Sequence, residues 1–479
     1  MRTHFRRSEI LSNIVNIGLG DLGSRVIAFA TFIYVARVLG PEKLGLIGFG
    51  ASTVALAVPF VDYGLGFVGT REVSRNPASL RFYIKTILFD RLVLGIVALV
   101  LFAAVAELFF DDPEKVRILL LYSLTLLPVV VTLTWAYQGI GETGWFTFEK
   151  NVQAVLYLAA VLVFVHWPGD VYRIPVAYTV AALVPAGIVL LYYTRRTGKT
   201  EGTFSAGSSF KLLRSSFRLF IPTLLSQINV PIGLLLVVYF SSLQEAGYFS
   251  AASKIILLAA ALPNLLWSSF YPVLSRSLIR DPKEMQHTGG VLYKYAVVIG
   301  VLPAFFGLMF PHEIVNLLFG PSYQEAVVPF ELFSVVASLQ FLSIVFTRIL
   351  PALGLDKSFS RIVTGGVVVQ LAAGLALIPR YGASGAAFSF ILAEGVMATA
   401  AMMIVRRLIR ARFVPEPAVS VLFLLLCYFI VMEIRTLTDI PLLVCLIAIA
   451  VLYILLLLAT SSISLKDFAY GYAGAGEVR

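Results

Sequence analysis

Long apolar stretches recur from one end of the chain to the other, and they constrain its fold more than any other feature. Each is roughly 18 to 25 residues long, about what an α-helix needs to cross a ~30 Å hydrocarbon layer. The stretches barely alternate with a period of two, which disfavours a membrane β-barrel. We therefore predict an all-α polytopic membrane protein with about 14 transmembrane helices, at residues 11-36, 44-66, 83-108, 116-138, 149-167, 174-194, 217-240, 246-272, 291-311, 326-350, 362-379, 383-405, 418-434 and 441-460.

Charged residues are scarce and unevenly distributed. They make up 13% of the chain, whereas soluble domains carry about 25%. With the N-terminus taken as cytoplasmic, 26 of the 37 Lys and Arg residues fall in inner loops and termini, 7 in outer loops and 4 within spans. This positive-inside distribution explains the net charge of +10 as a topology signal, not a nucleic-acid footprint. It predicts a multi-pass protein of the cytoplasmic (inner) membrane with both termini in the cytoplasm.

An internal repeat relates two parts of the chain. Three pairs of positions share one offset of 213 residues without a gap: Gly141 with Gly354, Leu158 with Leu371, and Gly169 with Gly382. A second set has offsets of 202 to 204 and pairs Glu42 with Glu245, Gly45 with Gly247, and Pro59 with Pro263. Because each copy holds six spans, both copies start on the same side of the membrane. The repeats are therefore parallel, and they predict a cavity where the halves meet.

The repeat also sets the expected domain organisation. We predict two parallel six-helix bundles, at residues 1-200 and 217-412. A polar cytoplasmic linker containing Gly and Ser joins them at 201-216. Two extra transmembrane helices and a cytoplasmic tail follow at 413-479, outside the repeat.

Basic residues inside the spans are candidates for substrate binding, because a lone ion at the bilayer centre costs at least about 2.5 to 3.5 kcal/mol and usually faces a cavity or the bundle interior. Arg25, near the middle of span 1, either binds an anionic substrate or is neutralised by Asp21 one helical turn earlier. Lys254 in span 8 has no acid at i±3 or i±4, and it either contacts ligand or snorkels to the interface. Arg348, just before Pro351 in span 10, has the same two interpretations.

Other polar residues within the spans supply further candidates. Gln227 and Asn229 lie between two prolines of span 7, which predicts a bent helix that lines a cavity and contacts substrate. Asp21, Asp62 and Glu394 are candidates for coupling transport to a proton or Na⁺, with structural pairing as the alternative.

Asp90 and Arg91 are adjacent in span 3 and point to different faces of that helix. We expect each of them to pair with a different helix in a structural role, and we leave both out of the predicted site.

The motifs of soluble enzymes are missing from the sequence. There is no HExxH, no CxxC and no GxxxxGK[ST]. The longest predicted outer loop, 311-326, is too short to carry the catalytic carboxylates of a membrane glycosyltransferase. We therefore predict no enzyme, no catalytic residues, no cofactor and no metal site, and we expect transport to draw on a gradient instead of nucleotide hydrolysis.

Several short motifs resemble one family in their order and spacing over about 300 residues. They are Ala36-Arg37-Val38-Leu39-Gly40-Pro41-Glu42, Leu44-Gly45, Asp62-Tyr63-Gly64-Leu65, Thr70-Arg71-Glu72, the run from Gly247 to Lys254, and Leu317-Leu318-Phe319-Gly320 with Tyr323 and Ala326. Together they resemble the oligosaccharide and polysaccharide (O-antigen type) flippases of the multidrug/oligosaccharidyl-lipid/polysaccharide exporter superfamily.

The resemblance implies a function and a set of partners. The expected substrate is a polyprenyl-pyrophosphate-linked oligosaccharide, moved across the membrane by alternating access for the synthesis of O-antigen, capsule or exopolysaccharide. Membrane lipid and polysaccharide polymerase or assembly proteins are the other expected partners. The resemblance carries over cavity-facing basic residues on spans 1 and 8, where this chain has Arg25 and Lys254. A drug/cation antiporter of the same superfamily and a non-transporting scaffold of a polysaccharide assembly complex remain as alternatives.

Overall fold

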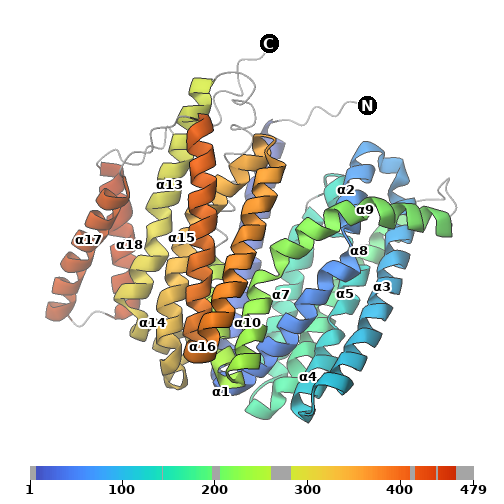
Figure 1. The fold of residues 1–479 in the computed structure, drawn as a ribbon, viewed down its shortest axis with the longest axis horizontal. Coiled ribbons are helices and arrows are strands. Elements are labelled where there is room, and N and C mark those ends of the chain that lie inside the picture. Colours follow the sequence, from blue (N-terminus) through green and yellow to red (C-terminus); the bar gives the residue numbers. More distant parts are fainter. Residues whose placement is uncertain are drawn as a thin grey trace. The chain divides into compact units, whose positions relative to one another are not determined.

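In the computed structural model the chain is built of helices (Figure 1). The structure describes residues 7–142, 144–196, 205–259, 282–409, 416–438 and 441–459. The α-helices are α1 (Arg7–Asp62), α2 (Leu65–Arg75), α3 (Leu80–Phe109), α4 (Pro113–Ser123), α5 (Leu126–Val131), α6 (Thr134–Gly139), α7 (Gly144–Phe164), α8 (Arg173–Arg196), α9 (Ala206–Gln227), α10 (Asn229–Phe240), α11 (Leu243–Ala259), α13 (Pro282–Met309), α14 (Pro311–Phe319), α15 (Val327–Ala352), α16 (Asp356–Ile409), α17 (Glu416–Thr438) and α18 (Leu442–Ala459). Three short 3₁₀ helices are η1 (Pro77–Ser79), η2 (Pro168–Tyr172) and η3 (Pro321–Ala326).

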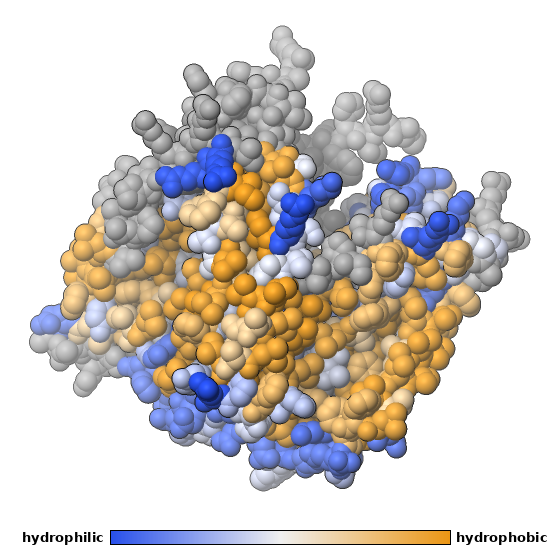
Figure 2. Space-filling model, viewed as in Figure 1, coloured by the Kyte–Doolittle hydropathy of each residue, from blue (hydrophilic) through white to orange (hydrophobic). Residues whose placement is uncertain are grey.

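The prediction of an all-α polytopic membrane protein is confirmed, and some helices hold two spans. Spans 1 and 2 form the single element α1, bent at Gly40, and spans 11 and 12 form α16, bent at Gly382. Eight helical stretches of the described chain are long and apolar enough to cross a membrane. In Figure 2 hydrophobic residues cover much of the helix sides, and hydrophilic residues gather toward the helix ends. Residues 260–272, the end of predicted span 8, lie outside the described residues.

The chain divides into two compact units. Unit 1 comprises Met1–Ala251 with Ile378–Ala383, and unit 2 comprises Ala252–Leu377 with Ser384–Arg479. Unit 1 has a core of buried side chains from α2, α3, α6 and α8, among them Val68, Ile87 and Tyr193. Unit 2 has one core on α13, α15 and α16, and a second that joins α13 to α17 and α18. The parallel arrangement of two six-helix bundles, with its linker boundaries, stays a prediction.

The 213-residue repeat reappears in backbone geometry. Gly141 and Gly354 both have positive φ, at 77° and 73°. The hydrogen bonds around them match atom for atom: Glu142 N donates to Tyr137 O, as Leu355 N donates to Leu350 O, and both distances are 2.9 Å. Each pair closes a helix with a Schellman-type cap, in which a left-handed glycine lets the chain satisfy the last carbonyls. The repeat is therefore structural at this loop.

The third matched pair differs between the copies. Gly382 has a φ of 50° inside α16, whereas Gly169 lies in the 3₁₀ helix η2 and is not among the positive-φ residues. The sequence match there marks the same connection, and the two copies turn it differently: one forms a separate turn and the other a bend between two fused helices.

Candidate functional site

A break in predicted span 4 creates the polar centre of unit 1. Helix α5 ends at Val131, Thr132 is extended with ψ 128°, and α6 begins at Thr134. The stretch before the break, residues 129–132, is entirely β-branched, a composition that weakens a helix. Backbone carbonyls that would accept hydrogen bonds within a continuous helix therefore lack their helical donors. Inside a membrane protein other groups must donate to them.

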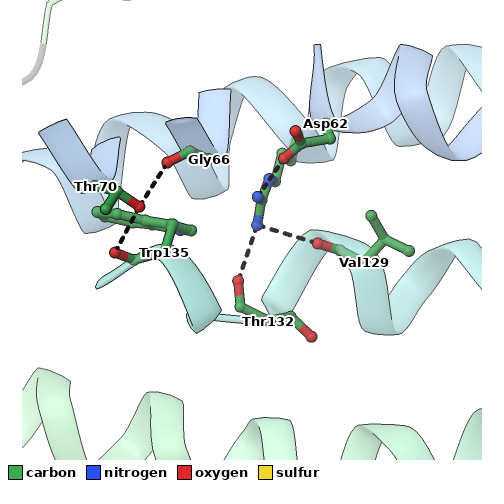
Figure 3. Close-up of polar contacts among 7 residues, drawn as sticks. Asp62, Gly66, Thr70, Val129, Thr132 and Trp135 are labelled. Carbon is green, nitrogen blue, oxygen red and sulfur yellow. Dashed lines mark hydrogen bonds and ion pairs between the residues drawn. The ribbon is translucent and has the colours of Figure 1, made fainter. Parts of the chain in front are cut away.

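Arg91 of α3 donates hydrogen bonds to two of those carbonyls. Its Nη1 donates to Thr132 O at 2.8 Å and to Val129 O at 3.3 Å, while its Nη2 donates to the Asp62 carboxylate at the end of α1. Figure 3 shows the Asp62 carboxylate and the two carbonyls on different sides of one guanidinium. Arg91 is only 6% exposed. A buried charge is tolerated when it is paired and hydrogen-bonded in this way, so the pair ties α1 and α3 to the broken span.

Helix α2 also packs closely on α6 beside the break. The Thr70 hydroxyl lies 3.0 Å from both the Gly66 and the Trp135 carbonyl oxygens (Figure 3). A Cβ placed on Gly69 would come within 2.5 Å of the Trp135 ring. Only a residue without a side chain lets α2 approach the indole this closely.

On the other side of the break, Glu149 of α7 faces a set of hydroxyls. Its Oε2 accepts from the Tyr137 hydroxyl at 2.7 Å, and its Oε1 accepts from Thr132 Oγ1 at 3.3 Å. Tyr137 in turn lies 3.0 Å from Thr134 Oγ1. The Glu149 side chain is 6% exposed. One residue, Thr132, thus receives Arg91 on its carbonyl and contacts Glu149 through its hydroxyl.

Asp90, the neighbour of Arg91, reaches a different helix. Its Oδ1 accepts from Ser209 Oγ of α9, and both residues are buried. The expectation that Asp90 and Arg91 pair with separate helices is confirmed. Both carry structural contacts of unit 1, as the sequence indicated.

The candidates of unit 1 occupy several places. Arg25 is partly buried in α1, and the Asp21 side chain lies outside the described residues. Asp62 belongs to the ion pair with Arg91, so an ion bound there would compete with a guanidinium. Gln227 is exposed at the end of α9, and Asn229 is partly buried at the start of α10.

The bend predicted for span 7 is confirmed, since Ile228 separates α9 from α10. Pro231 has no N–H to offer the carbonyl of Gln227 four residues earlier, which accounts for the interruption.

The candidates of unit 2 lie on three helices. Lys254 is partly buried in α11 and Arg348 is partly buried in α15. Glu394 of α16 is 8% exposed, and its Oε1 accepts from Gln340 Nε2 of α15 at 3.3 Å. Its Oε2 has no hydrogen-bond partner among the described residues. The binding and coupling roles of all these residues stay predictions.

Sequence reasoning missed the hydroxyl cluster around Glu149. The predicted span 5 begins at residue 149, at the edge of the membrane, whereas α7 already begins at Gly144. A glutamate more than one turn inside an apolar helix was the available signal. Its partners Thr132, Thr134 and Tyr137 lie on the broken part of span 4, and no sequence pattern placed them opposite Glu149.

The fold has counterparts among solved structures. The structure is similar to the lipid II flippase MurJ in an inward closed conformation, with a TM-score of 0.71 and 14% identity over 92% of this chain and 97% of that one. It is also similar to an inward-facing multidrug resistance MATE family transporter of the MOP superfamily, with a TM-score of 0.68 and 16% identity over 81% and 94% of the two chains. These two similarities show that the chain shares the fold of those multi-pass proteins.

Sequence comparison gives the family. The model of the family described as polysaccharide biosynthesis protein matches residues 10–278, more than half of the chain. The protein therefore belongs to that family. Among its relatives is a protein of Escherichia coli (strain K12) named as an O-antigen transporter, 24% identical over 82% of this chain and 96% of that one. A Shigella flexneri protein named in the same way is 25% identical over 80% and 94% of the two chains.

Proposed function

We propose that this protein translocates polyprenyl-pyrophosphate-linked oligosaccharide units across the cytoplasmic membrane by alternating access, for the synthesis of a cell-surface polysaccharide. The observation that carries the proposal is the family match over residues 10–278, together with relatives named for O-antigen transport that align over nearly their whole length. The similarity in fold to a lipid II flippase is consistent with it.

The chemistry of such a substrate fits the charges of the spans. A pyrophosphate carries about two negative charges, and charge-assisted hydrogen bonds from Arg and Lys are the strongest that a protein offers it. Arg25, Lys254 and Arg348 are the basic residues of the predicted spans that we propose for contact with the headgroup. Gln227 and Asn229 supply amides for sugar hydroxyls. The polyprenyl tail stays in lipid.

The proposed energy source is an ion gradient or the gradient of the substrate itself. Asp21, Asp62 and Glu394 are the carboxyls nominated for coupling. The excess of Lys and Arg in inner loops supports a cytoplasmic-membrane location with both termini in the cytoplasm.

A drug/cation antiporter is the second candidate, because the fold is shared with a multidrug resistance transporter. A cationic cargo favours an acidic path. The four basic residues placed within the predicted spans, Arg25, Arg91, Lys254 and Arg348, weigh against it. A scaffold of an assembly complex would tolerate neutralisation of Arg25 and Lys254, which separates it from both transporters.

The proposal is tested in cells that depend on this protein for surface polysaccharide. Wild type, Arg25→Ala and Lys254→Ala are expressed at matched levels, and both surface polysaccharide and lipid-linked precursor are measured. We expect each variant to lose surface polymer and to accumulate precursor. Arg75→Ala, which removes a largely exposed arginine of α2, is the control and should behave as wild type. Normal polymer in both span variants would contradict the proposed charge compensation.

A further inference from the structure

Glu149 differs from three other acidic residues of unit 1 in what surrounds its carboxyl group. Asp62 pairs with Arg91, Glu142 with Arg196 and Glu114 with Lys43. Glu149 forms no salt bridge to a described residue, and its hydrogen-bond partners are the hydroxyls of Tyr137 and Thr132. It is 6% exposed and lies in an apolar helix that is a candidate membrane span. Among the residues that the structure describes, only hydroxyl donors contact this carboxyl group.

Hydroxyls can serve this carboxyl group in both of its protonation states, because each one both donates and accepts. When Glu149 is ionised, Tyr137 donates to Oε2 at 2.7 Å and Thr132 donates to Oε1 at 3.3 Å. When a proton from water joins Oε2, the new O–H donates to the Tyr137 oxygen. Tyr137 then turns its own hydrogen to Thr134 Oγ1, already 3.0 Å away. No heavy atom has to move, and no hydrogen bond is lost.

The partly buried Asp62 of α1 and the buried Asp90 of α3 lack this property. Asp62 faces the Arg91 guanidinium, which only donates, so a proton on the bonded oxygen would break the pair. Asp90 has one hydroxyl partner, Ser209, and its Oδ2 has no hydrogen-bond partner among the described residues. Of the three, Glu149 alone has a hydroxyl at each carboxyl oxygen, which suits a site that repeatedly gains and loses a proton.

Several ionisable groups of the neighbouring helices form contacts other than an ion pair with Glu149. On α6 the neighbouring group is Tyr137, and Tyr193 of α8 hydrogen-bonds Glu142 at 2.7 Å. From α1 and α3, Asp62 and Arg91 pair with each other, and Arg91 reaches the carbonyl of Thr132 instead of the Glu149 carboxyl.

The cluster also connects the carboxyl group to the broken span. Thr132 is the extended residue of the break, and Thr134 and Tyr137 belong to α6 behind it. Hydrogen bonds to an ionised carboxylate are roughly twice as strong as those between neutral groups. Loss of the charge therefore weakens the hydrogen bonds between α7 and the broken span, while Arg91 remains hydrogen-bonded to the Thr132 carbonyl.

From this geometry we infer that Glu149 is a proton-binding site, and that its occupancy sets how tightly α7 holds α6 at the break in span 4. As a means of coupling transport to a proton gradient, the site rests on the proposed function. As a proton-binding site it does not.

Infrared difference spectroscopy of the purified full-length protein in lipid tests the site without any transport. The carbonyl stretch of a protonated carboxyl is followed as the pH is lowered. We expect a band that is lost in Glu149→Gln and kept in Glu114→Gln, which removes an exposed carboxyl group paired with Lys43. In Tyr137→Phe the band should remain at a shifted frequency, because the carboxyl group has lost a hydrogen-bond partner. A neutral amide fits the same hydroxyls, so Glu149→Gln is expected to fold, and its melting temperature is checked.

Two results would overturn the inference. One is a wild-type spectrum without a pH-dependent carboxyl band over the range in which the protein stays folded. The other is a band that persists unchanged in Glu149→Gln. Failure of lipid-linked oligosaccharide transfer in a protein that keeps the Glu149 band would count against the proposed function and leave the proton site intact.

Discussion

Gly45 and Gly247, equivalent positions of the repeat, each meet the backbone of the other's helix. A Cβ on Gly45 would lie 1.7 Å from the Leu243 carbonyl oxygen, and a Cβ on Gly247 would lie 1.9 Å from the Pro41 carbonyl oxygen. Pro41 and Leu243 are 202 residues apart, as Gly45 and Gly247 are. The contact is therefore two-fold related: the sequence echo marks a crossing of α1 and α11 that maps onto itself when the copies are exchanged.

Substitution of either glycine should disrupt this crossing. We expect Gly45→Ala and Gly247→Ala to prevent normal folding, because the methyl group would overlap a backbone carbonyl that has no flexible end to move aside. Gly187→Ala in α8 is the matched control, since nothing lies within 4 Å of its Cβ position. Melting temperature and yield of monodisperse protein after detergent extraction are the measurements. A Gly45→Ala protein as stable as Gly187→Ala would show that the helices do not cross this closely.

The paired caps at Gly141 and Gly354 predict equal effects at two distant sites. Neither glycine has an atom within 4 Å of its Cβ position, so only the left-handed backbone opposes a side chain. Alanine at each position should therefore lower stability by about 1 to 2 kcal/mol.

Asparagine should be tolerated better than alanine at both caps, because it adopts the left-handed region more readily. Thermal unfolding of the four single variants measures this. A penalty at one site without a penalty at the other would contradict the structural equivalence of the two loops.

Removal of the Arg91 side chain should be among the most damaging changes in unit 1. Arg91→Ala leaves the partly buried Asp62 carboxylate and the carbonyls of Val129 and Thr132 without their donor. Breaking a buried pair by removing one partner costs about 3 to 5 kcal/mol. The exposed Arg75→Ala should change stability by no more than about 0.5 kcal/mol. Equal unfolding midpoints for the two variants would rule out the network as a stabilising element.

Asp62→Asn in the Arg91→Ala background completes a double-mutant cycle. The second change should be less harmful there than in the wild-type background, because Asp62 has already lost its guanidinium partner. Additive effects of the two changes would show that the residues are not coupled.

Much of the architecture could be predicted from sequence, because a membrane imposes length and hydrophobicity on each span. The repeat was found from pairs of matched residues at one offset, and the caps at Gly141 and Gly354 confirm it at that loop. What escaped prediction depends on contacts between helices. The ion pair between Asp62 and Arg91 joins residues 29 positions apart on two helices, and no sequence pattern indicated it. Glu149 was not selected, because its hydroxyl partners face it only as a result of the break in span 4. The residue at that break, Thr132, is not a proline and so did not signal an interruption of the helix.

Leaflet transfer by the purified wild-type chain tests the proposed function most directly. The protein is reconstituted into proteoliposomes that contain a labelled polyprenyl-pyrophosphate oligosaccharide from its own host, and the fraction accessible to an external glycan-modifying reagent is followed over time. We expect accessibility to exceed the half that is exposed at the start and to approach completion, while protein-free vesicles stay at that half. Identical curves for the two preparations, with folded protein present, would contradict the assignment as a lipid-linked oligosaccharide flippase.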